Sequence, residues 1–181
     1  MSGLLVLQFS RPDDAQRNAH SRMISSAICK ATRSEICHVD IEMPGLSFIG
    51  AHIEDGIQER PFDYQVWALR IRVAIPATDA QLKTVYEYAR AMIGTPYDVE
   101  SIMGIAAGDG RLHDPSKLIC SSFAKLAVDE KSRVLRVAKD YWLVSPEELR
   151  IAATAAYGAV EQRVVGNGPV PPLVMAARVG A

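Results

Sequence analysis

The pattern of apolar and polar residues predicts a strand followed by a helix at the start of the chain. Residues 3–9 form a short apolar run, which is typical of a buried strand. Asp13 or Asp14 would then cap a helix that ends near Ala31. The apolar residues of this helix recur at helical spacing and would face a sheet: Ala15, Ala19, Met23, Ile24, Ala27 and Ile28.

The next segment predicts a hairpin. Residues 37–43 alternate between apolar and polar side chains, as a strand does when it presents one polar face. A Pro-Gly turn would return the chain antiparallel over residues 46–53. His52 would therefore lie beside His38, at the start of the first strand. The polar face of that strand would carry His38, Asp40 and Glu42.

A longer strand and a helix are predicted downstream. Residues 65–75 are rich in β-branched and aromatic residues. Arg70 and Arg72 share one face of this strand, where they would form a solvated edge or bind a substrate carboxylate. A helix would open at Thr78 and end at Gly94.

The second half of the chain brings a cysteine to a helix start. An irregular loop over residues 108–115 leads to Cys120, after which apolar residues return at helical spacing. Ser145 and Glu148 match a capping box for a further helix. From Gly166 the chain is rich in Gly and Pro, which is typical of an extended surface segment.

Composition and charge narrow the classes of protein. The chain has 181 residues, of which 49% are hydrophobic and 23% charged, and this fits one globular domain over residues 1–181. A formal net charge of -1 gives no reason to expect nucleic acid as a partner. No apolar run approaches the roughly 20 residues that cross a bilayer, and residues 1–8 lack the features of a signal peptide. We therefore expect a cytoplasmic protein without a transmembrane segment.

The three cysteines differ in their surroundings. They show no CxxC spacing, so neither a disulfide framework nor a zinc site is expected. Cys29 and Cys37 fall on predicted apolar faces and would be structural. Cys120 is different, because the unpaired N–H groups of a helix start lower the pKa of a thiol. The same N–H groups can form an oxyanion hole, so Cys120 is a candidate nucleophile.

A base for this thiol must come from the four histidines. His38 lies on a predicted strand that would hold its ring rigidly, whereas His20 and His113 are expected to be solvated. His52 would lie beside His38 and fix its tautomer. Three carboxylates are alternative orienting groups: Asp40, Glu42 and Glu54. On pattern alone, a buried structural thiol and surface histidines are the simpler interpretation.

Longer segments resemble the NlpC type of papain-like hydrolases. The His-bearing hairpin of that family is similar to CHVDIEMPGLSFIGAHIEDGI, and its Gly-x-Pro-Tyr element and Cys-Ser helix start are similar to IGTPYD and LICSSFAKLAVD. The order of His before Cys resembles the circularly permuted branch, which includes relatives of lecithin:retinol acyltransferase. A later VSPEEL segment resembles phage and bacterial proteins of unknown substrate. These matches cover most of residues 37–150.

The resemblance implies a fold and a site. The fold would be α+β and papain-like, with an antiparallel sheet packed against helices. Cys120 would be the nucleophile and His38 its base. Tyr97, near the thiol, and Ser121 would bind substrate or contribute to the oxyanion hole. The resemblance implies no metal and no cofactor.

The third catalytic position is where this chain departs from the family. The family's usual orienting residue falls at Gly50, which has no side chain. Its role would pass to His52, to a nearby carboxylate or to a backbone carbonyl. A missing orienting residue also fits a phage structural or binding protein that keeps the fold and has lost activity.

The implied reaction is acyl transfer through a thioester. The thiolate would attack an amide or peptide carbonyl, and cell-wall peptides are the substrate most often implied. An acyltransferase or lipid thioesterase on the same fold is the alternative enzyme. Without an export signal, an enzyme that cleaves the cell wall would act after phage delivery or lysis.

Overall fold

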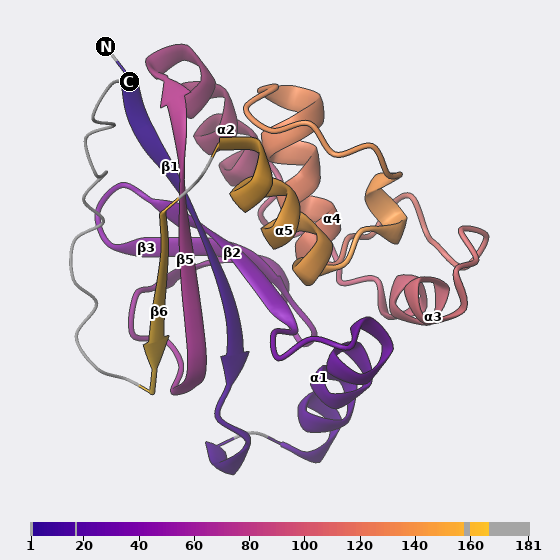
Figure 1. Ribbon diagram of the computed structural model, residues 1–181. Helices are drawn as coiled ribbons and strands as arrows, with labels where there is room; N and C mark the ends of the chain where they lie inside the picture. Colours follow the sequence, from indigo (N-terminus) through magenta and orange to yellow (C-terminus); the bar gives the residue numbers. More distant parts are fainter. Residues whose placement is uncertain (1, 17, 158–159, 167–181) are drawn as a thin grey trace.

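The protein is built on one six-stranded antiparallel sheet. A computed structural model describes residues 2–16, 18–157 and 160–166. The strands lie in the order β4-β3-β2-β1-β5-β6 (Figure 1). Their bounds are β1 Ser2–Pro12, β2 His38–Met43, β3 Ser47–His52, β4 Gly56–Pro61, β5 Trp67–Thr78 and β6 Val160–Val165.

Helices cover one face of this sheet and extend beyond one end. Helices α2, α4 and α5 contact the strands from one side, whereas α1 and α3 contact each other (Figure 1). The five α-helices of the described ranges are α1 Ala19–Thr32, α2 Asp79–Ala91, α3 Val99–Ala107, α4 Cys120–Lys125 and α5 Pro146–Tyr157. A π-helical stretch, Leu126–Lys131, extends α4, and two short 3-10 helices cover Asp14–Gln16 and Tyr141–Leu143. The fold is therefore mixed α and β, with an antiparallel sheet packed against helices.

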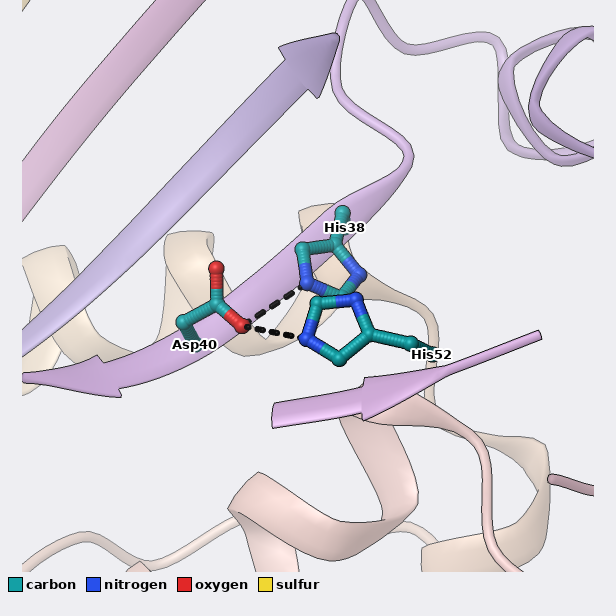
Figure 2. A group of neighbouring side chains, drawn as sticks. All are labelled: His38, Asp40 and His52. Carbon is teal, nitrogen blue, oxygen red and sulfur yellow. Dashed lines mark hydrogen bonds and ion pairs between the residues drawn. The ribbon is translucent and has the colours of Figure 1, made fainter. Parts of the chain in front are cut away.

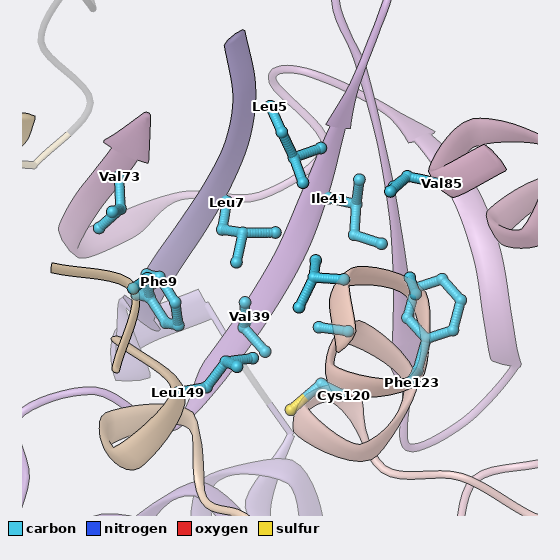
Figure 3. Close-up of a cluster of buried hydrophobic side chains, with 14 of the residues drawn as sticks. Leu5, Leu7, Phe9, Val39, Ile41, Val73, Val85, Cys120, Phe123 and Leu149 are labelled. Carbon is cyan, nitrogen blue, oxygen red and sulfur yellow. The ribbon is translucent and has the colours of Figure 1, made fainter. Parts of the chain in front are cut away.

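The main hydrophobic core lies between the sheet and these helices (Figure 3). Because side chains alternate along a strand, Leu7 and Phe9 of β1 point to the same face. They join Val39 and Ile41 of the neighbouring β2 in one buried cluster. Phe123 of α4 closes this cluster from the helix side, so the start of α4 is held against the middle of the sheet.

Local sequence signals predicted several elements correctly. The hairpin pairs β2 with β3 in antiparallel register, with Ile41 opposite Ile49. Thr78 caps α2 at the predicted start of this helix and forms a capping box with Gln81. At α5, Glu148 accepts hydrogen bonds from the Ser145 backbone and hydroxyl, and Ser145 accepts one from the Glu148 N–H. Strands β4 and β6 were not predicted.

The start of α1 differs from the prediction. Asn18 caps this helix by accepting a hydrogen bond from the Ser21 N–H at 2.8 Å. Asp13 accepts one from the Ala15 N–H, so its carboxylate closes a short turn before the helix instead of capping it. Asp14 belongs to the 3-10 helix that follows this turn. The expectation that Asp13 or Asp14 caps the helix was therefore wrong.

Helix α1 packs mainly on α3 rather than on the sheet. Its side chains Ile24 and Ile28 join Ile102 and Ile119 in a second apolar cluster. Met23, predicted to lie on the buried stripe, is 64% exposed. The buried apolar stripe of α1 is therefore narrower than the sequence pattern indicated.

The face of the sheet opposite the main core carries several buried polar side chains. Arg70 and Arg72, expected at a solvated edge, are only 4% and 6% exposed. Strand β5 lies between β1 and β6, so neither arginine is at an edge. Arg72 donates to both carboxylate oxygens of Glu42 at 2.7 to 3.0 Å, which compensates the burial of its charge.

Two further expectations concern a membrane-spanning helix and the segment after Gly166. No helix within the described residues combines the length and apolar character needed to span a membrane. The Gly- and Pro-rich segment expected from Gly166 lies, beyond that residue, outside the described residues.

Replacing Ile41 with Ala tests the central position of β2 in the core. The side chain is fully buried, so we expect Ile41→Ala to lower the free energy of unfolding by about 2 to 5 kcal/mol in urea titrations. Ile151→Ala is the matched control, because Ile151 is 52% exposed on α5 and its loss should change stability by about 0.5 kcal/mol or less. Equal effects of the two substitutions would contradict the described core.

Candidate active site

The hairpin of β2 and β3 brings two histidines and a carboxylate together (Figure 2). His38 and Asp40 are two residues apart on β2, so their side chains share one face of the sheet. The imidazole Nε2 of His38 lies 2.8 Å from Oδ1 of Asp40, which is the distance of a hydrogen bond. His52 enters from β3, and its ring centre lies 4.9 Å from that of His38.

Asp40 is the group that orients His38. Its carboxylate is completely buried, and its second oxygen, Oδ2, accepts a hydrogen bond from the Tyr64 hydroxyl at 3.0 Å. His52 lies farther away, with Nε2 3.9 Å from Oδ1 of Asp40, which is too long for a hydrogen bond. Nε2 of His52 has no hydrogen-bond partner within the described residues, so it does not make the bond to His38 that the sequence led us to expect. The bond to the His38 ring comes from Asp40, one of the alternative carboxylates.

The missing side chain of Gly50 makes room for this carboxylate. Continued by one residue, the register of β2 and β3 sets Gly50 opposite Asp40. A Cβ atom at position 50 would lie 1.9 Å from Oδ1 of Asp40, far inside van der Waals contact. The resemblance located an orienting residue at this position. In this chain the Asp40 carboxylate of the neighbouring strand β2 fills that space, and it is hydrogen-bonded to His38.

Cys120 stands at the start of a helix, as the sequence predicted. It is the first residue of α4, the capping residue Ile119 makes no side-chain hydrogen bond, and the Phe123 N–H donates to the Ile119 carbonyl. The thiol belongs to the buried cluster beside Val39 (Figure 3) and is 1% exposed. The thiol acts on the pKa of His38, so the thiol and the imidazole are neighbours.

The electrostatics of the site favour a charged His38. Burial alone would lower the pKa of His38, but the negative charges of Asp40 and Cys120 and its hydrogen bonds to both raise it to about 10. Burial raises the pKa of Asp40, and the charge and hydrogen bond of His38 outweigh this and lower it. The arrangement thus stabilises an imidazolium between two groups that can carry negative charge.

The surroundings of His52 lower its pKa, whereas those of His38 raise the pKa of that ring. Burial and the positive charge of His38 lower its pKa to about 3, although Asp40 partly offsets this. Its Nε2 is buried and has no hydrogen-bond partner among the described residues. Two histidines 4.9 Å apart are therefore held in different protonation states, with His38 charged and His52 neutral.

Two cavities adjoin the site. The larger has a volume of about 340 Å³, opens to solvent, and is lined by both histidines and by polar residues of α1 and of the loop before β5. The smaller surrounds Cys120 with apolar side chains. Ile28 and Tyr97 line both cavities, so they separate the thiol from the open space. Tyr97 and Cys120 therefore line the same small cavity.

Other predicted site residues have structural partners. The Ser121 hydroxyl donates to the Val144 carbonyl at 2.7 Å, so this hydroxyl is not directed at a substrate. Glu42 is paired with Arg72, and Glu54 accepts hydrogen bonds from α1 and its cap. His113 was expected to be solvated, but its ring stacks on Trp142 at 4.9 Å. His20 is exposed, as predicted.

Sequence reasoning missed Tyr64 altogether. This residue lies in the loop before β5, 24 positions from the carboxylate that it contacts. No local pattern marks it. Asp40 did carry a signal, because it lies two residues after His38 and therefore on the same face of a strand.

Comparisons with known proteins assign no family to the chain. No family model matches its sequence, and no curated protein matches it. The chemical interpretation of the site therefore depends on its own geometry.

A double-mutant cycle tests whether Gly50 makes room for Asp40. Gly50→Ala should lower the free energy of unfolding by about 2 kcal/mol, because the new methyl group displaces the buried carboxylate. In an Asp40→Ala background the same substitution should cost less than about 0.5 kcal/mol, since the clashing oxygen is gone. Urea titrations of the four proteins give the coupling, and equal costs in both backgrounds would refute the steric account.

The neutral state of His52 predicts a pH dependence of stability. Its pKa is about 3 in the folded protein and near 6.5 when unfolded, so the unfolded chain binds the extra proton between these values. His52 therefore has no effect on the pH dependence of stability above pH 6.5. As the pH falls from 6.5 toward 3, proton uptake by the unfolded chain lowers the free energy of unfolding. Between pH 7 and 4.5, wild type should lose on the order of 2 kcal/mol more stability than His52→Phe. Parallel curves for the two proteins would contradict the neutral state.

Proposed function

We propose that this chain is a papain-like cysteine hydrolase of the permuted NlpC type, which cleaves an amide or peptide bond through a thioester on Cys120. The observation that carries the proposal is the buried pair of His38 and Asp40 beside a thiol at a helix start. A nucleophile, a base and an orienting group of the base are the three parts that such catalysis requires.

The geometry assigns a role to each nitrogen of His38. Since Nε2 is hydrogen-bonded to Asp40, Nδ1 is the nitrogen left to accept the proton of Cys120. Proton transfer gives a thiolate and an imidazolium, and the adjacent Asp40 carboxylate stabilises the imidazolium. Tyr64 holds the carboxylate in place through its second oxygen.

The reaction then follows from these positions. The thiolate attacks the substrate carbonyl, and backbone N–H groups at the start of α4 stabilise the negative charge on the carbonyl oxygen. His38 donates its proton to the leaving amine as the carbon–nitrogen bond breaks, which leaves a thioester on Cys120. A water molecule gives a proton to His38 and attacks the thioester, which releases the acid and restores the thiol.

The open cavity supports a polar substrate. Its wall includes Asn18, Ser21 and Gln65, and it also carries one acidic and one basic side chain, Glu54 and Arg60. A volume of about 340 Å³ lies within the range of small-ligand sites and would hold a short peptide segment. Cell-wall peptides, which carry both charges, fit this lining, and they would be reached after phage delivery or lysis.

Access to the thiol requires a movement. Cys120 is 1% exposed, and Ile28 and Tyr97 stand between it and the open cavity. Ile28 is on α1, which packs mainly on α3 through a small apolar cluster. A small displacement of α1 would therefore join the two cavities.

The apolar lining around Cys120 favours a second candidate, an acyltransferase or lipid thioesterase. Ala31, Ile102, Ile105 and Ile119 contribute to the small cavity at the thiol. Such walls suit the alkyl chain of an acyl group better than a polar peptide. The same thioester chemistry would then act on an ester.

Alkylation measures the reactivity of the thiol directly. With iodoacetamide near neutral pH, peptide mass mapping should show Cys120 modified faster than Cys29 and Cys37, although Cys29 is the most exposed of the three. His38→Ala should slow this modification by at least about tenfold, because the base is lost. Modification of Cys120 no faster than that of the other two would favour an inactive binding or structural protein.

Intact-mass spectrometry with two model esters separates the candidate enzymes. A p-nitrophenyl acetate and a p-nitrophenyl palmitate should each leave a thioester on wild type and none on Cys120→Ser. Preferential labelling by the acetate supports the polar-substrate hydrolase, whereas preferential labelling by the palmitate supports the acyltransferase or lipid thioesterase.

A further inference from the structure

The hairpin of β2 and β3 also groups three side chains that could hold a metal ion. We propose that His38, Asp40 and His52 form a binding site for one Zn²⁺ ion, and that the bound ion switches off the thiol of Cys120. The metal site stands on geometry alone, whereas the switch rests on the function proposed above.

Three possible ligand atoms converge between β2 and β3 (Figure 2). His38, Asp40 and His52 each offer one ligand atom, and these three atoms all lie within 4.8 Å of one another. The two distances to the carboxylate oxygen are 2.8 and 3.9 Å. Ligand atoms about 2.0 to 2.2 Å from a tetrahedral Zn²⁺ are roughly 3.3 Å apart, so small side-chain rotations would fit all three to one ion.

One ring nitrogen of His52 is left without a hydrogen bond by the described residues. Its side chain is 14% exposed, and its Nε2 has no partner within the described residues. Both carboxylate oxygens of Asp40 have partners, because Oδ1 bonds to His38 and Oδ2 to Tyr64. A buried nitrogen without a partner is costly, and a metal ion beside it would remove that cost.

The surroundings support a metal ion. The Tyr64 hydroxyl holds Oδ2 and leaves Oδ1 directed at both imidazoles, as an orienting group does around a metal ligand. The two histidines line the open cavity, so an ion can reach the group and a water molecule can complete its coordination. Two imidazoles and one carboxylate with an open position form a ligand set that Zn²⁺ uses in proteins.

Metal binding and thiol activation exclude each other at His38. When Zn²⁺ binds Nε2, the proton held there is released to solvent and the remaining ring proton stays on Nδ1. Nδ1, the nitrogen assigned above to Cys120, then holds the only ring proton, so His38 can neither take up the proton of a neutral thiol nor give a proton to a leaving group. The Asp40 carboxylate is drawn to the ion as well, and the base loses its orienting partner.

The metal site is tested by calorimetric titration of the full chain with ZnCl2 in a thiol-free buffer. We expect one Zn²⁺ per chain, with binding weakened by at least about tenfold in His52→Phe and unchanged in His20→Ala, an exposed histidine. Binding should persist in Cys120→Ser, and Mg²⁺ should not compete, because its preferred ligands are oxygens. No binding to wild type, equal binding to His52→Phe, loss of binding in Cys120→Ser, or competition by Mg²⁺ would each overturn the site.

The switch is tested separately by the rate at which iodoacetamide modifies Cys120. Saturating Zn²⁺ should slow this rate by at least about tenfold in wild type and leave it unchanged in His52→Phe. Zn²⁺ binding without a change in rate would overturn the switch and leave the metal site intact. A Cys120 that is unreactive even without metal would instead refute the proposed function, and the calorimetric result would still decide the site.

Discussion

The structure depends on one buried carboxylate. Asp40 lies on a central strand with no access to water, and an isolated charge in that position would be strongly destabilising. It is tolerated because His38 and Tyr64 each bond one of its oxygens. These partners fix the local architecture. The strand must alternate so that His38 shares the face of Asp40, the opposite strand must carry Gly50, and the loop before β5 must bring Tyr64 back to the sheet.

This constraint changes how the position at which the resemblance implies an orienting residue is understood. A glycine where a family carries an orienting side chain suggests a lost site. Here the glycine is the condition for an orienting group on the neighbouring strand, because any larger residue would occupy the space of the Asp40 carboxylate. His52 is thereby left neutral and without a hydrogen-bond partner among the described residues. The same hairpin can then present a charged imidazole to a thiol or a pair of imidazoles to a metal ion.

Local patterns of the sequence predicted much of this fold, and long-range pairings account for what they missed. Alternation identified the hairpin, and capping residues identified α2 and α5, because these signals act within a few residues. Alternation shows which side chains share a face but not whether another segment covers that face. Arg72 was therefore placed in solvent, although Glu42 on another strand pairs with it and β6 flanks its strand. Tyr64 could not be found for the same reason, since its partner is distant in sequence.

The most direct test of the account is the protonation of His38, measured by an NMR pH titration of its ring. With Asp40 beside it and the thiol of Cys120 as its other neighbour, its midpoint should lie near pH 10 in wild type. Replacing the carboxylate in Asp40→Asn should lower that midpoint by several pH units, because the charge that stabilises the imidazolium is gone. A wild-type midpoint near the ordinary value of 6.5, unchanged in Asp40→Asn, would contradict the central role of the buried pair.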